Sequence, residues 1–288
     1  MSPRPESSAR SAFSRSVIRL MAVACLAAPL GACSLWDEDD TYKPQAQDPA
    51  DLLYNQGLAS IKARDFTKAA KRFDQLDRTY PGTEWSKKAI LMNAYANYEG
   101  GKYDDSVASA QRYFTLYPQS PDAAYAAYLY ASSNYAMIPD VTRDQERTFK
   151  ALGAFEEIVK RWPNSEYADD AKFKVQVTKD QLAGKEMEVG RYYLNKNNPT
   201  AAANRFKVVV SKYQQTRHVE EALSRLAECY MALGVASEAQ TAAAILGHNY
   251  PDSQWYKDAH TLVSSKGLAP RIDEGSWLTK TFRNVITM

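Results

Sequence analysis

The side chains that could perform catalysis or bind a metal are few and scattered in this 288-residue chain. Its three histidines, His218, His248 and His260, are spaced too widely for a local pair of metal ligands. The phosphate-binding loop G-x-x-x-x-G-K-[ST], the zinc motif H-E-x-x-H and the nucleophile motif G-x-S-x-G are all missing from the sequence. We therefore predict no catalytic residues, no metal site and no cofactor.

One cysteine stands in a pattern that specifies a chemical modification. A polar segment with four arginines is followed by an apolar run at residues 20–30, and Gly31 and Ala32 then precede Cys33. These are the three parts of a secretory signal, and the run is too short to span a hydrocarbon core of ~30 Å. The ending resembles the bacterial lipobox, whose cysteine is lipidated and becomes the first residue of the mature protein. We predict a lipoprotein signal peptide at 1–32 and a lipidated Cys33; an ordinary signal peptide cut near Ala32 would instead leave a free thiol.

The segment after Cys33 predicts where the anchor places the chain. By analogy with bacterial lipoproteins, Ser34 at the next position favours transport to the outer membrane. Residues 33–49 are rich in acids, contain Pro44 and Pro49 and lack periodicity, which is typical of a flexible tether. Each buried CH₂ of a lipid chain contributes ~0.8 kcal/mol, so a multiply acylated cysteine binds the bilayer durably. We predict a lipid-anchored outer-membrane protein that faces the periplasm.

The composition excludes several classes of protein. A chain with 45% hydrophobic and 11% aromatic residues can bury a substantial core, whereas a mean hydropathy of −0.51 excludes an integral membrane protein. The net charge is +2, and four arginines against one glutamate precede Cys33, so the remainder is nearly neutral. A nearly neutral chain has no electrostatic footprint for nucleic acid. Cys25 would leave with the signal peptide and Cys33 would be acylated, so Cys229 is the one free thiol left and we predict a fold without disulfides.

Recurrent residues predict five similar helical hairpins. An aromatic residue recurs at Tyr80, Tyr117, Trp162, Tyr213 and Tyr250, and proline follows all of them except Tyr213. Eleven residues before each aromatic is a small residue, and seven before it is an apolar one: Ala69, Ser106, Ala151, Ala202 and Ala239, then Phe73, Ala110, Phe155, Phe206 and Ala243. Small residues let paired helices cross closely, and proline ends the second helix. The pattern resembles the tetratricopeptide repeat and predicts an all-α, superhelical solenoid of five tetratricopeptide-like helical hairpins.

We divide the predicted solenoid into repeats 1–3 at 50–165, repeats 4 and 5 at 166–261, and a tail at 262–288. Repeat 3 carries an extra loop around 137–147, and 166–195 is predicted to be one long helix. The serine or threonine three residues after each aromatic is a candidate N-cap for the next helix: Thr83, Ser120, Ser165, Thr216 and Ser253. For the tail we keep three alternatives: it caps the solenoid, binds a neighbour or frays.

Two surfaces are candidates for binding other proteins. The first helices of the early repeats carry a predicted peptide or substrate groove formed by Tyr54, Asn55, Tyr95, Tyr98 and Tyr128. Tyrosine offers flat apolar area with a polar tip, which suits an extended peptide with an aromatic end; alternatively, these rings pack between hairpins. The second surface lies in repeat 4 and includes Lys196, Asn204 and Arg205. An arginine can hold a partner carboxylate through two hydrogen bonds, although a solvated arginine fits the spacing equally well.

The lipobox, the tether and the repeats together resemble the BamD family of lipoproteins of the β-barrel assembly machinery. Residues 143–147 and 162–167 look like that family's third repeat, and 192–205 like its fourth; the similarity covers about 48–260. The resemblance implies a non-enzymatic scaffold whose C-terminal repeats dock a barrel-forming BamA-like subunit. It also implies a place beside other assembly-machinery lipoproteins, and an N-terminal groove for unfolded outer-membrane proteins. The resemblance further implies that Lys196 and Arg205 are interface residues. Lys196 stands at a position where the family can have an arginine.

A second interpretation is a periplasmic tetratricopeptide adaptor that coordinates cell-envelope division or peptidoglycan synthesis. Such an adaptor would usually carry an N-terminal coiled coil. The tether at 33–49 has no heptads, which counts against this interpretation.

Overall fold

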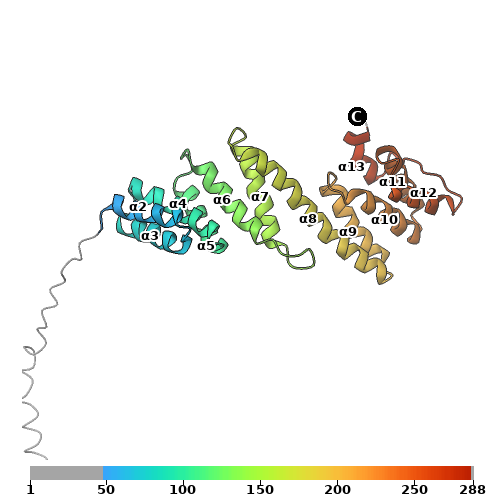
Figure 1. The fold of residues 1–288 in the computed structure, drawn as a ribbon. Coiled ribbons are helices and arrows are strands. Elements are labelled where there is room, and N and C mark those ends of the chain that lie inside the picture. Colours follow the sequence, from blue (N-terminus) through green and yellow to red (C-terminus); the bar gives the residue numbers. More distant parts are fainter. Residues whose placement is uncertain (1–47, 287–288) are drawn as a thin grey trace, which may run out of the picture. The chain divides into compact units, whose positions relative to one another are not determined.

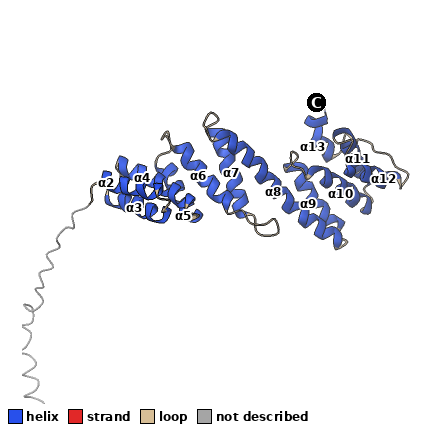
Figure 2. Ribbon diagram, in the orientation of Figure 1, coloured by secondary structure: helices blue, strands red, loops and turns tan. Residues whose placement is uncertain are grey.

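The computed structural model describes residues 48–286, and every regular element in that range is an α-helix (Figures 1 and 2). The predicted signal peptide, the candidate lipidation site Cys33 and nearly all of the tether lie outside the described residues. Among the described helices, none has both the length and the apolar character that a membrane span requires.

Ten of the helices form five consecutive hairpins. They are α2 (Ala50–Lys62) with α3 (Phe66–Thr79), α4 (Glu84–Glu99) with α5 (Tyr103–Leu116), α6 (Ala123–Ala136) with α7 (Glu146–Arg161), α8 (Ala168–Asn195) with α9 (Pro199–Lys212), and α10 (Val219–Ala232) with α11 (Ala236–Asn249). Two further helices follow, α12 (Gln254–Ser264) and α13 (Trp277–Ile286). Each helix from α2 to α11 packs against the next, and α2 and α6 also contact α4. The predicted all-α solenoid of five hairpins is confirmed.

The recurrent small and apolar residues form the packing surface between the helices of each hairpin. All ten have no exposed area: Ala69, Ser106, Ala151, Ala202 and Ala239, and Phe73, Ala110, Phe155, Phe206 and Ala243. In two repeats, the first helix carries a glycine opposite the phenylalanine of the second helix. A Cβ on Gly57 would lie 2.6 Å from Phe73 Cε1, and one on Gly190 would lie 2.6 Å from Phe206 Cζ. The ring therefore excludes any side chain at these two positions.

The turn inside four of the five hairpins, all except that of repeat 3, uses a left-handed backbone at the position sixteen residues before the repeat's aromatic. Gly101 and Gly234 occupy this position with φ of 71° and 74°. Repeats 1 and 4 place Arg64 and Asn197 there instead, with φ of 58° and 53°. Asparagine and glycine tolerate this region, whereas an arginine is strained in it, so Arg64 is an unexpected residue at this turn.

The N-cap prediction is correct in two repeats and wrong in three. Thr83 and Ser253 cap α4 and α12, and their hydroxyls accept hydrogen bonds from Ser86 N and Trp255 N. The N-caps of α6, α8 and α10 are Asp122, Tyr167 and His218 instead of Ser120, Ser165 and Thr216. In repeats 3 to 5 an extra turn precedes the helix; in one case it is closed by Ala168 N–H and the carbonyl of Ser165. The Ser165 hydroxyl instead donates to the carbonyl of Trp162, at 2.9 Å.

Helix α8 joins repeats 1–3 to repeats 4 and 5, and it is the one long helix predicted at 166–195. Its 28 residues extend over about 42 Å at 1.5 Å per residue. At its middle, Gly184 lies beside Val141 of the loop between α6 and α7 and beside His218 before α10. The loop is held to α8 by hydrogen bonds from Gln181 Nε2 and Lys185 Nζ to loop carbonyls, at 3.0 and 2.8 Å.

The residues after α12 pack on the last hairpin. Leu278 and Phe282 of α13 are buried in the same core cluster as Leu246 of α11, and α13 lies against α11 (Figure 1). The Trp277 indole N–H donates to the hydroxyl of Tyr230 at 2.9 Å. The predicted start of the tail at 262 falls inside α12, so that boundary does not coincide with a helix end.

Candidate partner-binding surfaces

Tyrosines from α4, α6 and the start of α8 form one aromatic surface, which we call the tyrosine surface. It consists of Tyr95, Tyr98, Tyr125, Tyr128 and Tyr167. Tyr95, Tyr98 and Tyr125 pack against one buried cluster. The rings of Tyr125 and Tyr128 both stack on Tyr167, at centroid distances of 5.4 and 4.9 Å. All five are half-buried, so each presents part of its ring to solvent while the rest packs between hairpins.

An ion pair on α8 between the partly buried Lys174 and the exposed Asp170 holds Tyr128 in place. Lys174 Nζ lies 2.8 Å from Asp170 Oδ2 and donates to the hydroxyl of Tyr128 at 2.9 Å. That hydroxyl in turn donates to Asp170 at 2.7 Å, and the ammonium lies 4.9 Å from the Tyr128 ring centroid. Burial opposes the charge on Lys174, but its hydrogen bonds to Asp170 and Tyr128 hold its pKa above the usual value. The surface thus contains a locally neutralised charge.

The tyrosine surface is suited to neutral, partly apolar ligands. Burial raises the pKa of Tyr98 and of Tyr125, so both phenols stay protonated at physiological pH. Each hydroxyl can donate to a peptide carbonyl, and each ring offers area to an apolar side chain. Tyr167, Asp170 and Lys174 were missed as site residues in the sequence. Their spacing of three and four residues, which places side chains on one helical face, is the signal that could have identified them.

Two of the predicted groove residues lie elsewhere. Tyr54 belongs to a separate cluster in repeat 1, where its ring lies 5.8 Å from that of Phe73 and 5.6 Å from that of Trp85. The alternative of packing between hairpins therefore describes Tyr54 well. Asn55, the next residue, is exposed. The structure brings Tyr95, Tyr98 and Tyr128 into one surface and leaves Tyr54 and Asn55 outside it.

The predicted residues of repeat 4 are all exposed on the hairpin of α8 and α9. Arg205 Nη1 lies 3.4 Å from Glu186 Oε2 of α8, and Lys196 Nζ lies 5.8 Å from the ring of Tyr192. Arg205 lies beside Glu186, and Glu186 precedes Lys196 by ten residues, which is about 15 Å along a helix. Lys196, Asn204 and Arg205 therefore form an extended exposed strip, which we call the repeat-4 strip, and the loosely held Arg205 can exchange Glu186 for another carboxylate.

Beside this strip, an ionic network connects α8 with α10. Arg191 Nε and Nη2 donate to the two carboxylate oxygens of Glu221, at 2.9 and 2.6 Å. The guanidinium of Arg191 also donates to Glu188 at 2.6 Å. Burial opposes the charge on Glu221, but the paired arginine holds its pKa below the usual value. Arg191 is committed to this network, whereas Arg205 remains accessible.

Comparison with known proteins identifies the family. Residues 46–246 match the family model YfiO, described as an outer membrane lipoprotein. The chain is 43% identical over 225 residues to the outer membrane protein assembly factor BamD of Caulobacter vibrioides, which covers 78% of this chain and 74% of the relative. It is 41% identical over 247 residues to the BamD of Rickettsia prowazekii (85% and 96% covered) and 31% identical over 252 residues to that of Neisseria meningitidis serogroup A (84% and 94% covered). The chain belongs to the YfiO/BamD family.

The YfiO/BamD match contains both candidate surfaces and ends inside α11 at residue 246. Helices α12 and α13 lie beyond it. Within residues 48–286 there is no group of three or more histidine, cysteine, aspartate or glutamate side chains that could hold a metal.

Proposed function

We propose that this chain is an outer membrane protein assembly factor of the β-barrel assembly complex, acting as a lipid-anchored scaffold on the periplasmic side. The observation that carries the proposal is that its relatives of 43%, 41% and 31% identity, from three genera, are all outer membrane protein assembly factors. A solenoid of helical hairpins supports it, because such scaffolds bind other proteins along extended surfaces. The scaffold has no enzymatic activity of its own.

The anchor is proposed at Cys33. Replacing Cys33 by alanine is expected to abolish labelling with radioactive palmitate and to move the protein from the membrane fraction to the soluble fraction, because the acyl chains supply the membrane affinity. The buried Cys229 provides a matched control, since Cys229→Ala should leave labelling unchanged. Labelling that persists in the Cys33→Ala variant would rule out this anchor.

The repeat-4 strip is proposed to dock the barrel-forming BamA-like subunit. Arg205 supports this role because its side chain is exposed and its ion pair with Glu186 is long, at 3.4 Å. Arg205→Glu should lower the recovery of the barrel subunit by about tenfold when the chain is purified from detergent-solubilised envelopes, since reversing a charge across an interface is repulsive. Recovery is measured by quantitative immunoblotting against the wild-type chain.

Arg78 offers the control for this experiment, because it is exposed in repeat 1 and forms a single ion pair with Asp74. Arg78→Glu should leave recovery unchanged. Equal recovery with Arg205→Glu and the wild-type chain would remove Arg205 from the interface. Co-purification of a division or peptidoglycan complex without a barrel protein would contradict the proposed function as a whole.

The tyrosine surface is proposed to receive unfolded outer-membrane proteins through segments with an aromatic end. A fluorescent peptide with the sequence of the last strand of an outer-membrane barrel is the probe, and fluorescence anisotropy is the measurement. Tyr98→Ser should weaken binding about fivefold because it removes ring area, whereas Tyr98→Phe should retain it. Tyr192→Ser, at an exposed tyrosine of α8, is the control. Equal loss of affinity in the Tyr98→Ser and Tyr192→Ser variants would contradict binding at this surface.

A further inference from the structure

The repeats create equivalent grooves between the second helices of neighbouring hairpins, above the first helix that lies between them. We call these the second-helix grooves. In the last pair of hairpins, the groove between α9 and α11 is filled by α13 of the chain itself. Helix α13 packs against α11, Trp277 reaches Tyr230 of α10, and Lys207 Nζ of α9 lies 5.4 Å from the Trp277 ring.

The way in which α13 fills its groove defines what such a groove accepts. Leu278 and Phe282, one turn apart, are buried in the core of the last repeats. At the start of the helix, Ser276 Oγ donates to Glu238 Oε2 at 2.6 Å and accepts from Leu278 N at 3.0 Å. A short amphipathic helix therefore binds with two apolar side chains in the groove and its N-terminus beside residue 238.

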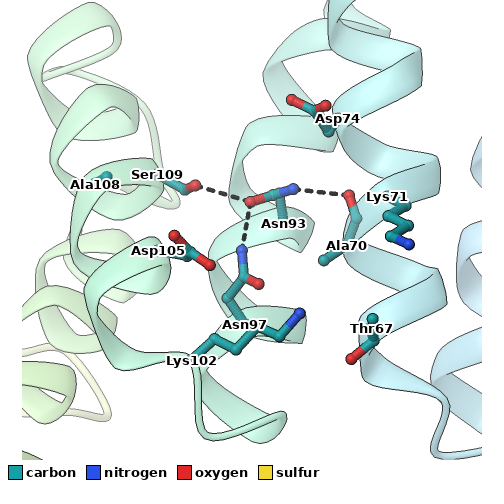
Figure 3. Close-up of a pocket in the computed structure, with 10 residues that line it drawn as sticks. All are labelled: Thr67, Ala70, Lys71, Asp74, Asn93, Asn97, Lys102, Asp105, Ala108 and Ser109. Carbon is teal, nitrogen blue, oxygen red and sulfur yellow. Dashed lines mark hydrogen bonds between the residues drawn. The ribbon is translucent and has the colours of Figure 1, made fainter.

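The corresponding groove among α3, α4 and α5 is polar (Figure 3). It encloses about 300 Å³. Its floor is Asn93, whose Nδ2 donates to the Ala70 carbonyl, and whose Oδ1 accepts from Asn97 and Ser109, each at 2.8 Å. Lys71, Asp74, Lys102 and Asp105 also line it. Apolar side chains would bury these polar groups without replacing their solvent, so this groove does not suit an amphipathic helix.

The groove among α5, α6 and α7 is more apolar and about 210 Å³ in volume, although Lys150, Glu157 and Arg161 also line it. Tyr130 stands at the position of Asn93 in its repeat, thirteen residues after the preceding aromatic, and its ring meets Phe114 edge-to-face at 5.6 Å. Gly153 and Trp162 also line the groove. Phe149 on its wall has 58% of its area exposed in the described part of the chain. A large exposed ring beside an apolar groove marks a binding surface.

The charge at one position distinguishes this groove from the filled one. Lys150 and Glu238 are equivalent, each twelve residues before the aromatic of its repeat. Where Glu238 receives a serine hydroxyl at the N-terminus of α13, Lys150 carries a cation, whose Nζ lies 2.6 Å from Oε1 of the exposed Glu146 on the same helix and can exchange it for another carboxylate. A helix in the second groove is therefore matched by an acidic residue at its N-terminus, which its own dipole also favours.

We propose that the groove formed by Phe114, Tyr130, Phe149, Gly153 and Trp162 binds an amphipathic helix of a partner protein. The helix places two apolar side chains one turn apart against Tyr130 and Phe149 and sets an acidic N-terminal residue beside Lys150. This binding is independent of the proposed docking of the barrel subunit, because the groove lies on α5, α6 and α7 and the repeat-4 strip lies on α8 and α9.

The test uses a helix-stabilised, fluorescent peptide with the sequence of residues 273–286, which begins with Asp273 and Glu274 and contains Leu278 and Phe282. Its binding to the purified full chain is measured by fluorescence anisotropy. Gly153→Arg should weaken binding by about tenfold or more by filling the groove, and Lys150→Glu by about threefold by repelling the acidic end. A Cβ at Gly153 meets no atom within 4 Å, so the fold should tolerate the change.

Ala108→Arg is the matched control, because Ala108 occupies in the polar groove the position that Gly153 has in the apolar one. It should leave the affinity unchanged, and a peptide carrying Phe282→Ala should lose binding. Absence of saturable binding to the wild-type chain would overturn the proposal. Equal affinity for the wild-type and Gly153→Arg chains would also overturn it, since the peptide would then bind elsewhere, for example by displacing α13.

Discussion

Replacing Gly190 by alanine is expected to lower the free energy of unfolding by about 2 kcal/mol, although alanine is the better helix former. The added Cβ would lie 2.6 Å from Phe206 Cζ, far inside van der Waals contact. Phe206 is wholly buried and surrounded by close-packed side chains, so its ring has no free space to enter. Thermal unfolding followed by circular dichroism measures the effect, and each kcal/mol corresponds to about 2–4 °C in a domain of this size.

Gly153→Ala is the matched control, because it makes the same change inside helix α7 where the new Cβ meets nothing within 4 Å. It should raise stability by about 0.5–1 kcal/mol, since alanine loses less conformational entropy in a helix than glycine does. Phe206→Leu in the Gly190→Ala background should recover part of the loss by removing the clashing edge of the ring. If both alanine variants change stability in the same direction, the close approach of the Phe206 ring is not the reason for the glycine at 190.

The hairpins could be predicted from the sequence because their determinants are local and periodic. Ala69 and Phe73, like Ala202 and Phe206, face the partner helix of their own hairpin, only a few turns away along the chain. The prolines and the left-handed turn at Gly101 and Gly234 are equally local. For the same reason the long helix α8 was predictable, since no helix breaker interrupts its apolar pattern.

The candidate surfaces were predictable only in part, because they depend on how neighbouring hairpins are rotated against one another. The tyrosine spacing identified Tyr95, Tyr98 and Tyr128, but the stacking of Tyr128 on Tyr167 and its hydrogen bond from Lys174 join residues more than 35 positions apart. Tyr54 has the same residue type and yet packs against Trp85 of the next hairpin. Periodicity gives the face of a helix on which a side chain lies, and the angle between helices decides what covers it.

Arg191 of α8 and Glu221 of α10 form an ion pair, and replacing one partner or the other should lower the free energy of unfolding by unequal amounts. Arg191→Met is expected to cost about 2 kcal/mol, because it leaves the carboxylate of Glu221, whose side chain is only 12% exposed, without its two-bond partner. The remaining cation near Glu221 is Arg225, at a distant 3.7 Å. Glu221→Met should cost about 1 kcal/mol, since Arg191 retains Glu188 as an acceptor at 2.6 Å. Urea unfolding at pH 7 measures both losses.

The double variant Arg191→Met/Glu221→Met separates a need for charge from a need for contact. Removing both charges together should cost less than Arg191→Met alone, because no buried carboxylate is then left unpaired and the two thioether side chains can pack together. The exposed pair of Arg78 and Asp74 is the control, where Arg78→Met should change stability by about 0.3 kcal/mol at most. Acid unfolding gives an independent reading. Because the pKa of Glu221 is lowered in the folded chain, its contribution is present above its ordinary pKa and is lost as the pH falls through the lowered value. The acid-side loss of stability should therefore be smaller in Glu221→Met than in the wild-type chain. A double variant less stable than Arg191→Met would show that the ion pair contributes more than a packed apolar pair can replace.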